Sequence, residues 1–236
     1  METTDTPTTT APPPLRWSGL GTRVLSGVVM AAVTLWALWQ GGWVFILMVT
    51  AAALQMIREW DGLTAKDSKA FKILGVFYVA VPAASLVWLR QLHVANHPAA
   101  GAEVVLYVLF VVWATDIGAY FAGRRIGGKK LAPRISPNKT WAGLIGGMVS
   151  ASIVGGICAV FTPYPPSWVA GMDLGILLAV ISQVGDLFES WLKRRIGAKD
   201  SSTLIPGHGG LLDRVDGLVF ALPVFALFLS LSGLTP

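Results

Sequence analysis

The sequence is poor in charged residues and in cysteine. Only 13% of its 236 residues are Asp, Glu, Lys or Arg, about half of the fraction that soluble domains usually carry. This shortage argues against a soluble globular domain. The single cysteine, Cys158, excludes a disulfide within the chain and says nothing about the redox compartment.

Several familiar sequence signals are also missing. The glycines and lysines at 127–130 lack the spacing of a Walker A loop, and no G-x-G-x-x-G follows a strand. A P-loop ATPase and a Rossmann enzyme are therefore excluded. The first 20 residues are polar and rich in proline, with no basic segment before a short apolar region and cleavage site. They predict a disordered tail rather than a cleaved signal peptide.

Long apolar runs dominate the rest of the chain, which is 54% hydrophobic with a mean hydropathy of +0.63. A helix needs roughly 20 apolar residues to cross a bilayer. The runs predict an all-α, polytopic integral membrane protein with about seven transmembrane helices. Only Gly41 and Gly42 separate the first two runs, which predicts a tight helical hairpin. The predicted spans are 23–40, 43–58, 72–90, 104–123, 142–162, 173–193 and 216–234.

Lysine and arginine alternate sharply between successive loops. The N-terminal tail and the even-numbered loops hold 17 of the 18 Lys and Arg residues, and the remaining segments hold only Arg90. By the positive-inside rule the N-terminus and the even loops are cytoplasmic and the C-terminus lies outside. The alternation also supports an odd number of spans.

Acidic residues gather around the sixth loop, where the positive-inside rule does not require them. Asp186, Glu189 and Lys193 share one helical face, and Glu189 with Lys193 could be a simple helix-end ion pair. Asp213 and Asp216 could merely favour the positive end of a helix, or they could hold a divalent cation. The acids in or beside this loop are Asp186, Glu189, Asp200, Asp213 and Asp216.

The segment "PGHGG" between these acids suits a backbone that approaches a phosphate closely. Gly207, Gly209 and Gly210 add no Cβ bulk. His208 could contact a phosphate or could be a structural loop residue. On its own this segment could also be an ordinary turn.

The fourth loop carries a second group of polar residues, "TDIGAYFAGRRIGGKKLAPRISPNKTWAG". Asp116 lies within the fourth span and is a functional candidate, although it could simply pair with a basic residue of the loop. In "SPNKTW", Ser136 or Asn138 is expected to cap the fifth helix. Lys139 and Thr140 then lie where a helix start favours an anion. Six basic residues in this loop also suit anionic lipid.

Residues 190–216, "SWLKRRIGAKDSSTLIPGHGGLLDRVD", resemble the CTP:phosphatidate cytidylyltransferases. The segments "GDLFESWLKR" and "SPNKTWAG" are also similar to that family and occur in the same order. The resemblance covers roughly 104–217. One position departs from it, because Ala142 stands where the family usually has Glu in Ser-Pro-x-Lys-Thr-x-Glu-Gly.

The resemblance implies that a phosphatidate oxygen attacks the α-phosphorus of CTP and that pyrophosphate leaves. The implied partners are CTP, phosphatidate and membrane lipid, with no nucleic acid, and the implied cofactor is Mg²⁺, with room for a second ion. Glycines in the fifth span would permit a homodimer. The implied location is a bacterial-type inner membrane with the active site facing the cytoplasm. The chain then divides into a tail (1–20), N-terminal transmembrane helices (21–100) and a catalytic transmembrane domain (101–236).

The resemblance also implies roles for individual residues. The metal ligands would be Asp186, Asp213 and Asp216. The catalytic residues would be Asp186, Asp213, Lys193, Lys199, Arg214 and His208. Contacts to substrate would come from Ser136, Lys139, Thr140, Arg194, Gly207, Gly209 and Gly210. Asp116, Glu189 and Asp200 would support these residues.

Three other functions remain open from the residues themselves. A transporter or channel also explains seven spans and a buried Asp116, but it predicts charges at the bilayer midplane and paired interrupted helices. A CTP-dependent polyprenol or phytol kinase would use similar metal and basic groups to transfer a γ-phosphoryl group. A scaffold that binds anionic lipid explains the basic residues but not the clustered acids.

Overall fold

The computed structural model describes residues 20–95, 97–205 and 208–236. Within these residues, seven helices are long and apolar enough to cross a membrane, which confirms the predicted number of spans and the helical membrane fold. Their ends lie within a few residues of the predicted ones. The helices are α1 (Leu20–Gln40), α2 (Gly42–Leu63), α3 (Lys69–Arg90), α4 (Ala100–Arg125), α5 (Trp141–Phe161), α6 (Trp168–Arg195) and α7 (Leu212–Leu231).

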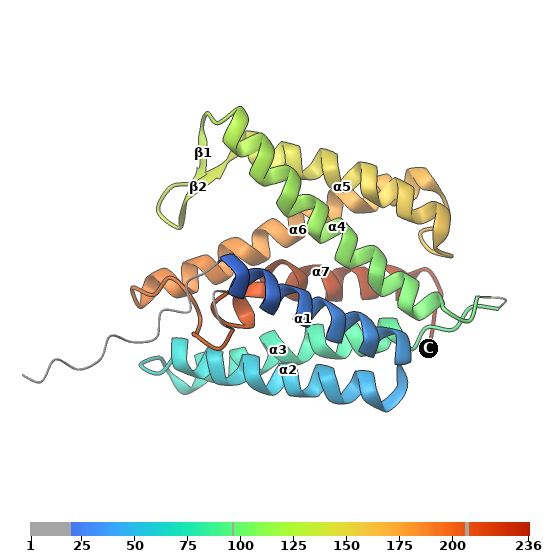
Figure 1. Cartoon of the computed structure of the whole chain (residues 1–236), viewed down its shortest axis with the longest axis horizontal. Coiled ribbons are helices and arrows are strands. Elements are labelled where there is room, and N and C mark those ends of the chain that lie inside the picture. Colours follow the sequence, from blue (N-terminus) through green and yellow to red (C-terminus); the bar gives the residue numbers. More distant parts are fainter. Residues whose placement is uncertain (1–19, 96, 206–207) are drawn as a thin grey trace, which may run out of the picture.

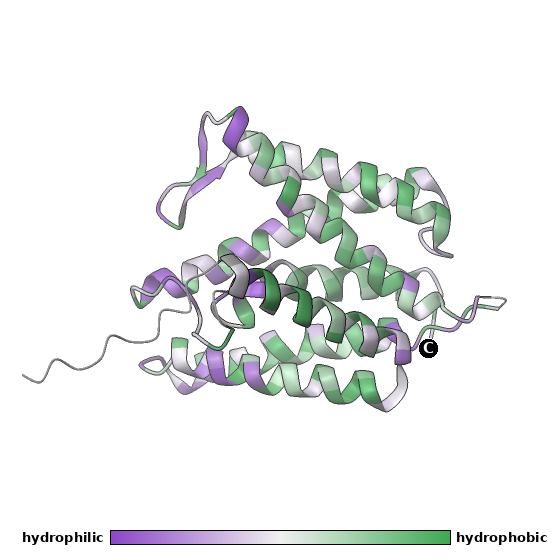
Figure 2. Ribbon diagram, viewed as in Figure 1, coloured by the Kyte–Doolittle hydropathy of each residue, from purple (hydrophilic) through white to green (hydrophobic). Residues whose placement is uncertain are grey.

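The loops between these helices sort into two groups at opposite ends of the bundle (Figure 1). Loops 64–68 and 126–140, with the loop residues 196–205 and 208–211, gather at one end, which we call the polar end. The helix bodies are largely apolar, and hydrophilic residues concentrate toward the polar end (Figure 2). The loop grouping agrees with the alternation of basic residues in the sequence.

The opposite end carries the single basic residue that breaks the alternation, and its role there is structural. Arg90 donates from Nε to the carbonyl of Leu38 at 2.7 Å and from Nη2 to that of Trp39 at 3.2 Å. These carbonyls end α1 and have no partner within the helix. Gly41 and Gly42 follow with φ of 65° and 50°, so the tight hairpin predicted between α1 and α2 is confirmed.

The fourth loop contains a small antiparallel hairpin that the all-α prediction missed. Strand β1 (Lys130–Ala132) pairs with β2 (Ser136–Thr140), with Lys130 opposite Thr140. The prediction that Ser136 or Asn138 caps α5 was wrong, because the extended chain continues to Thr140. Thr140 Oγ1 accepts from the Gly143 amide at 3.0 Å and is the cap.

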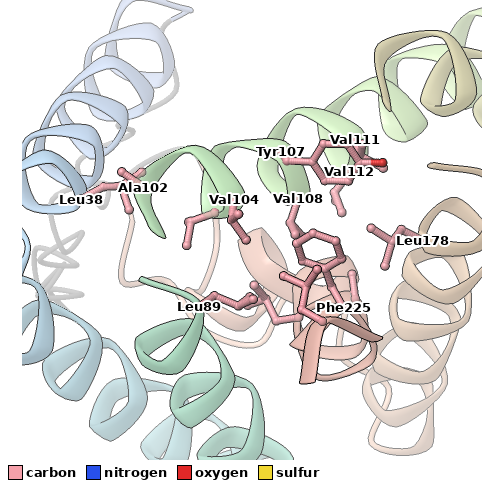
Figure 3. Packing of buried hydrophobic residues seen from close by; sticks show 14 of the residues in the cluster. Leu38, Leu89, Ala102, Val104, Tyr107, Val108, Val111, Val112, Leu178 and Phe225 are labelled. Atoms are coloured by element: carbon pink, nitrogen blue, oxygen red, sulfur yellow. The ribbon is translucent and has the colours of Figure 1, made fainter. Parts of the chain in front are cut away.

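Small residues bring α4, α5 and α6 close together. A Cβ added at Gly171 of α6 would lie 2.5 Å from the Gly155 carbonyl oxygen of α5. Tyr107 of α4 donates to the Gly171 carbonyl at 2.7 Å, and its ring stacks on Phe225 of α7 with centroids 5.3 Å apart. Figure 3 shows this core, in which Tyr107 lies among valines of α4. This packing fixes the position of α4 relative to α6, and these two helices carry acidic residues toward the polar end.

Substituting Gly171 by Ala is expected to destabilise the folded protein by about 1–3 kcal/mol, because an added methyl group overpacks this contact. The matched control is Gly62→Ala, since a Cβ at Gly62 meets nothing within 4 Å. A thermal-shift assay in detergent should show a lower Tm for Gly171→Ala and an unchanged or slightly higher Tm for Gly62→Ala. Equal melting temperatures would contradict the close approach of α5 and α6.

Candidate active site

A cavity of about 670 Å³ opens at the polar end between α4, β2, α5 and α6. This volume lies within the range of about 300–1000 Å³ that is typical of ligand pockets. Polar and charged side chains from three elements line it, together with glycines that leave room beside them. The polar lining residues are Asp116, Tyr120, Arg124, Asn138, Lys139, Thr140, Gln183 and Asp186.

A chain of polar contacts runs along the cavity wall. Lys139 Nζ lies 2.5 Å from Asp186 Oδ2 and donates to Gln183 Oε1 at 2.9 Å. Gln183 Nε2 in turn donates to Asp116 Oδ1 at 3.4 Å. Residues from α4, β2 and α6 are thereby linked, and the ammonium group of Lys139 is held by α6. The glutamate that the resembled family usually has at position 142, where this chain has Ala142, is therefore not needed to hold Lys139.

The cavity presents two cations to a ligand. The Lys139 side chain is 17% exposed, and Arg124 donates to Tyr120 Oη at 2.5 Å, one turn back on the same helix. Asp116, Tyr120 and Arg124 are spaced four residues apart on α4, which puts them on one face of the helix, and all three line the cavity. Two cations beside a helix start suit a phosphate group.

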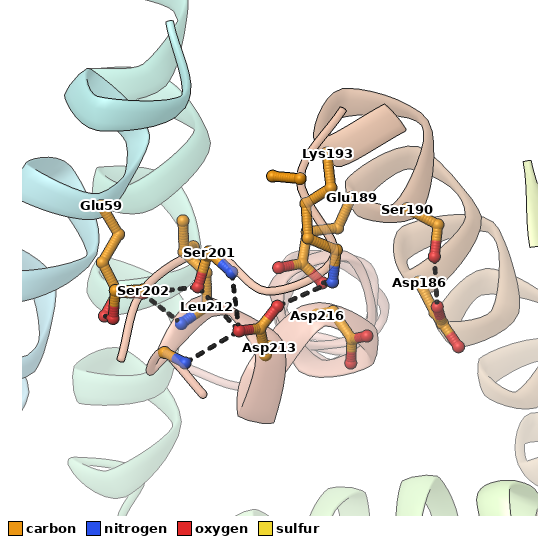
Figure 4. A network of polar contacts seen from close by, with 12 residues as sticks. Glu59, Asp186, Glu189, Ser190, Lys193, Ser201, Ser202, Leu212, Asp213 and Asp216 are labelled. Atoms are coloured by element: carbon orange, nitrogen blue, oxygen red, sulfur yellow. Dashed lines mark hydrogen bonds and ion pairs between the residues drawn. The ribbon is translucent and has the colours of Figure 1, made fainter. Parts of the chain in front are cut away.

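Asp213 lies in a second polar cluster, between the loop after α6 and the first turn of α7 (Figure 4). Its side chain is 4% exposed. Oδ2 accepts from the Ser201 amide at 2.8 Å, the Ser201 hydroxyl at 3.0 Å and the Gly210 amide at 2.8 Å. Oδ1 accepts from Lys193 Nζ at 2.7 Å. Four donors thus satisfy this buried carboxylate, and the Gly-Gly segment contributes one of them.

Helix α6 connects the two clusters. Lys193 Nζ also lies 3.2 Å from Glu189, which is 1% exposed, so the predicted i, i+4 ion pair is confirmed. Two turns earlier, Asp186 accepts from Ser190 Oγ at 3.2 Å and borders the cavity. Asp216 of α7 lies between Asp213 and Asp186 in Figure 4 and is close enough to Asp186 for their charges to interact.

The three predicted metal ligands differ in their surroundings. In the part of the chain that the structure describes, no group of three or more Asp, Glu, His or Cys side chains is arranged to hold a metal ion. Asp213 is enclosed by its four donors, and Asp186 faces Lys139 and Ser190. Asp186 and Asp216 have the carboxylate oxygens that Mg²⁺ prefers. The metal prediction stays a prediction, and these two residues suit it best.

The other predicted residues are spread over the polar end. His208 Nδ1 lies 2.9 Å from the hydroxyl of Ser26 on α1. Arg194 donates to the Ala198 carbonyl at 2.7 Å and closes the end of α6, whereas Lys199 and Arg214 are exposed. Ser136 is half-buried in β2. Asp200 lies beside Gly209, whose φ is 82°. Gly207 lies outside the described residues.

Two residues in these clusters were not found from the sequence. Gln183 links Asp116 to Lys139, but a neutral glutamine in an apolar helix gave no signal. Glu59 of α2 is 4% exposed and contacts the loop that holds Asp213. In the sequence it directly follows Arg58 and stands two positions before Asp61, so it looks like one more charge at a solvated helix end.

The chain is similar over most of its length to a known family of enzymes. Residues 61–232 match the model of the cytidylyltransferase family. The chain is 39% identical to the phosphatidate cytidylyltransferase of Brucella suis biovar 1, over 89% of this chain and 93% of that protein. It is 42% identical to the enzyme of the same name from Haemophilus influenzae, over 79% of this chain and 65% of that protein. The enzyme of the same name from Pseudomonas aeruginosa is 36% identical, over 89% of this chain and 71% of that protein.

Proposed function

Because the chain belongs to the cytidylyltransferase family and is a multi-pass membrane nucleotidyltransferase, we propose that it transfers CMP from CTP to phosphatidate. The products are CDP-diacylglycerol and pyrophosphate. The observation that carries this proposal is the cavity at the polar end, where Lys139 is held by Asp186 beside Arg124. The cavity places two cations, Lys139 and Arg124, where they can bind a phosphate group, and its walls are membrane helices against which a diacyl lipid can lie.

The main obstacle to this reaction is the repulsion between two phosphorylated reactants. Two unit charges 4 Å apart repel by about 4 kcal/mol at an effective dielectric constant near 20. Lys139 and Arg124 offset this repulsion at the cavity, and Lys193 lies two turns away from Asp186 along α6. With both reactants held in line, the enzyme needs mainly to position them and to stabilise charge.

The chemical step forms one bond and breaks one. A phosphate oxygen of phosphatidate attacks the α-phosphorus of CTP, and the bond from that phosphorus to the oxygen bridging the α- and β-phosphates breaks. Pyrophosphate leaves with the electron pair of the broken bond. No side chain acts as a covalent nucleophile, because the lipid supplies the attacking oxygen. The cations of the cavity stabilise the charge that shifts onto the leaving pyrophosphate.

The proposal includes dependence on Mg²⁺, held by Asp186 and Asp216 with water and substrate phosphates as further ligands. When bound, such an ion neutralises phosphate charge and stabilises the leaving group. Adding EDTA to the purified protein should therefore reduce CDP-diacylglycerol formation to background, and excess Mg²⁺ should restore it. Full activity in EDTA, after dialysis against metal-free buffer, would contradict this part of the proposal.

We further propose that the polar end faces the cytoplasm of a bacterial-type inner membrane. The 17 Lys and Arg of the tail and even loops support this orientation. Soluble CTP would reach the cavity from that side, while the acyl chains of phosphatidate stay among the membrane-facing helices.

The experiment that tests the proposed function follows the label of CTP. Purified protein in detergent is incubated with phosphatidate, Mg²⁺ and CTP carrying ³²P at either the α- or the γ-position. Label from the α-position should enter the lipid while pyrophosphate is released. Lipid labelled only from the γ-position would instead show a lipid kinase, and no labelled lipid from either substrate would reject both enzymes.

A further inference from the structure

We propose that Glu59 of α2 is a positioning residue for the cytidylyl transfer proposed above, on which this inference rests. It holds residues 201, 202 and 211 of the loop and the start of α7 in the conformation that places Asp213. Glu59 does not line the cavity, and it was not among the residues predicted from the sequence. The family match begins at residue 61, so Glu59 also lies outside the matched region.

The Glu59 carboxylate is almost fully buried and lies within hydrogen-bond distance of five donor groups, one of which, the Ser201 hydroxyl, it shares with Asp213. Oε1 accepts from the Leu211 amide at 2.9 Å, Ser202 Oγ at 2.8 Å and Gln55 Nε2 at 3.2 Å. Oε2 accepts from the Leu212 amide at 2.8 Å and Ser201 Oγ at 3.0 Å. Three of the five donors belong to the segment between α6 and α7, and a fourth, the Leu212 amide, belongs to the first residue of α7. One side chain of α2 therefore ties down a loop that is far away in the sequence.

Glu59 also does what a helix cap does for α7. The first amide groups of a helix have no partner within it and carry a partial positive charge. The residue that precedes α7, Leu211, offers no side-chain cap. The carboxylate of Glu59 arrives from another helix and accepts from the amides of Leu211 and Leu212 instead. Asp213 follows directly, so the position of its backbone depends on these two contacts.

A shared serine connects Glu59 to Asp213. Ser201 Oγ lies 3.0 Å from Glu59 Oε2 and 3.0 Å from Asp213 Oδ2. A hydroxyl has one proton, so it donates to one carboxylate at a time, and the Ser201 amide keeps the second bond to Asp213. The contacts form a continuous path from Glu59 through Ser201 and Asp213 to Lys193, which Figure 4 shows.

The space around Glu59 is tight on the side of the Gly-Gly segment. A Cβ at Gly210 would lie 2.7 Å from Glu59 Oε2. The Gly210 amide donates to Asp213 at 2.8 Å, so this glycine lets the loop pass between the two carboxylates. A Cβ at Gly210 would also lie 2.0 Å from Ser201 Oγ, so the need for glycine at this position follows from Ser201 and Glu59 together.

The site requires a carboxylate and not an amide. Each oxygen of Glu59 faces one backbone N–H, that of Leu211 or that of Leu212. In Glu59→Gln, either orientation of the amide group directs its NH₂ at one of these N–H groups. One buried donor is then left unsatisfied, and the start of α7 loses half of its cap.

The test compares wild-type protein, Glu59→Gln and the matched control Asp61→Asn, which removes an exposed carboxylate two residues away that pairs only with Lys72 in the described structure. Glu59→Gln should lower kcat about 30-fold, equivalent to about 2 kcal/mol, while the KM for phosphatidate stays within about twofold. Hydrogen–deuterium exchange should rise in peptides covering 199–213 and stay unchanged in peptides of α5. Asp61→Asn should match wild type in all three measurements.

The exchange measurement separates this inference from the proposed function. If wild-type protein makes no CDP-diacylglycerol, the proposed function fails, while exchange at 199–213 still reports whether Glu59 holds the loop. Unchanged exchange in Glu59→Gln, or wild-type kcat, overturns the inference. If Glu59→Gln does not fold, Glu59→Asp is measured in the same way. Its shorter side chain cannot reach both amides, so the same changes are expected and their absence again overturns the inference.

Discussion

Replacing Asp213 by Asn is expected to lower kcat roughly 1000-fold or more while the protein still folds and inserts in detergent or membranes. Asp213 accepts from two backbone amides, one hydroxyl and the ammonium of Lys193. Every neighbour is a donor, so the NH₂ group of Asn faces another donor in either orientation. Lys193 also loses its short ion pair, and the charge balance beside Glu189 changes.

The matched control is Asp173→Asn, because Asp173 lies exposed in the second turn of α6, far from the polar end. It should keep kcat within about twofold of wild type. The measurement is the steady-state rate of α-labelled lipid formation, with size-exclusion chromatography to confirm the folded state. Near-normal turnover by a correctly folded Asp213→Asn protein would show that the contacts of Asp213 with Lys193, Ser201 and Gly210 are not needed for catalysis.

Replacing Lys139 by Met is expected to lower kcat/KM for CTP roughly 100-fold to 1000-fold. Methionine fills a similar volume but removes the charge that pairs with Asp186 at 2.5 Å and donates to Gln183. The cavity then presents Asp186 and Asp116 to a phosphate with only Arg124 to oppose their repulsion. Both the binding of the anion and the stabilisation of the leaving group should weaken.

Lys130→Met provides the control for a general loss of positive charge. Lys130 lies exposed in β1 of the same hairpin, opposite Thr140, and does not line the cavity. Its substitution should change kcat/KM for CTP by no more than about threefold at physiological ionic strength. Equal losses in Lys130→Met and Lys139→Met would indicate that the hairpin acts only through its summed charge.

The membrane fold could be predicted from the sequence because its signals are local. An apolar run of about 20 residues is sufficient to indicate a span, and the tight hairpin at Gly41 and Gly42 follows from two adjacent glycines. The pairing of Glu189 with Lys193 is also local, since residues four apart on a helix are neighbours. Each of these features depends on a few consecutive residues, and the structure confirms each of them.

The parts of the site that escaped prediction depend on contacts between distant segments. Glu59 meets Leu211 and Leu212 more than 150 positions later in the chain, and nothing around "REWDG" indicates a buried acid. Lys139 reaches Asp186 and Gln183 only because the β1–β2 hairpin folds back over α6. Because strand β2 of this hairpin extends to Thr140, the residue that caps α5 is Thr140 and not Ser136 or Asn138 as predicted. Tertiary packing decided these positions, and no local pattern records it.

The most direct measurement of the central claim is an experimental structure with a CTP analogue that carries a methylene group between the α- and β-phosphorus atoms. The account predicts that the triphosphate lies in the cavity at the polar end, within hydrogen-bond distance of Lys139 and Arg124 and next to Asp186. An analogue bound elsewhere on the protein, with this cavity filled only by water, would contradict it.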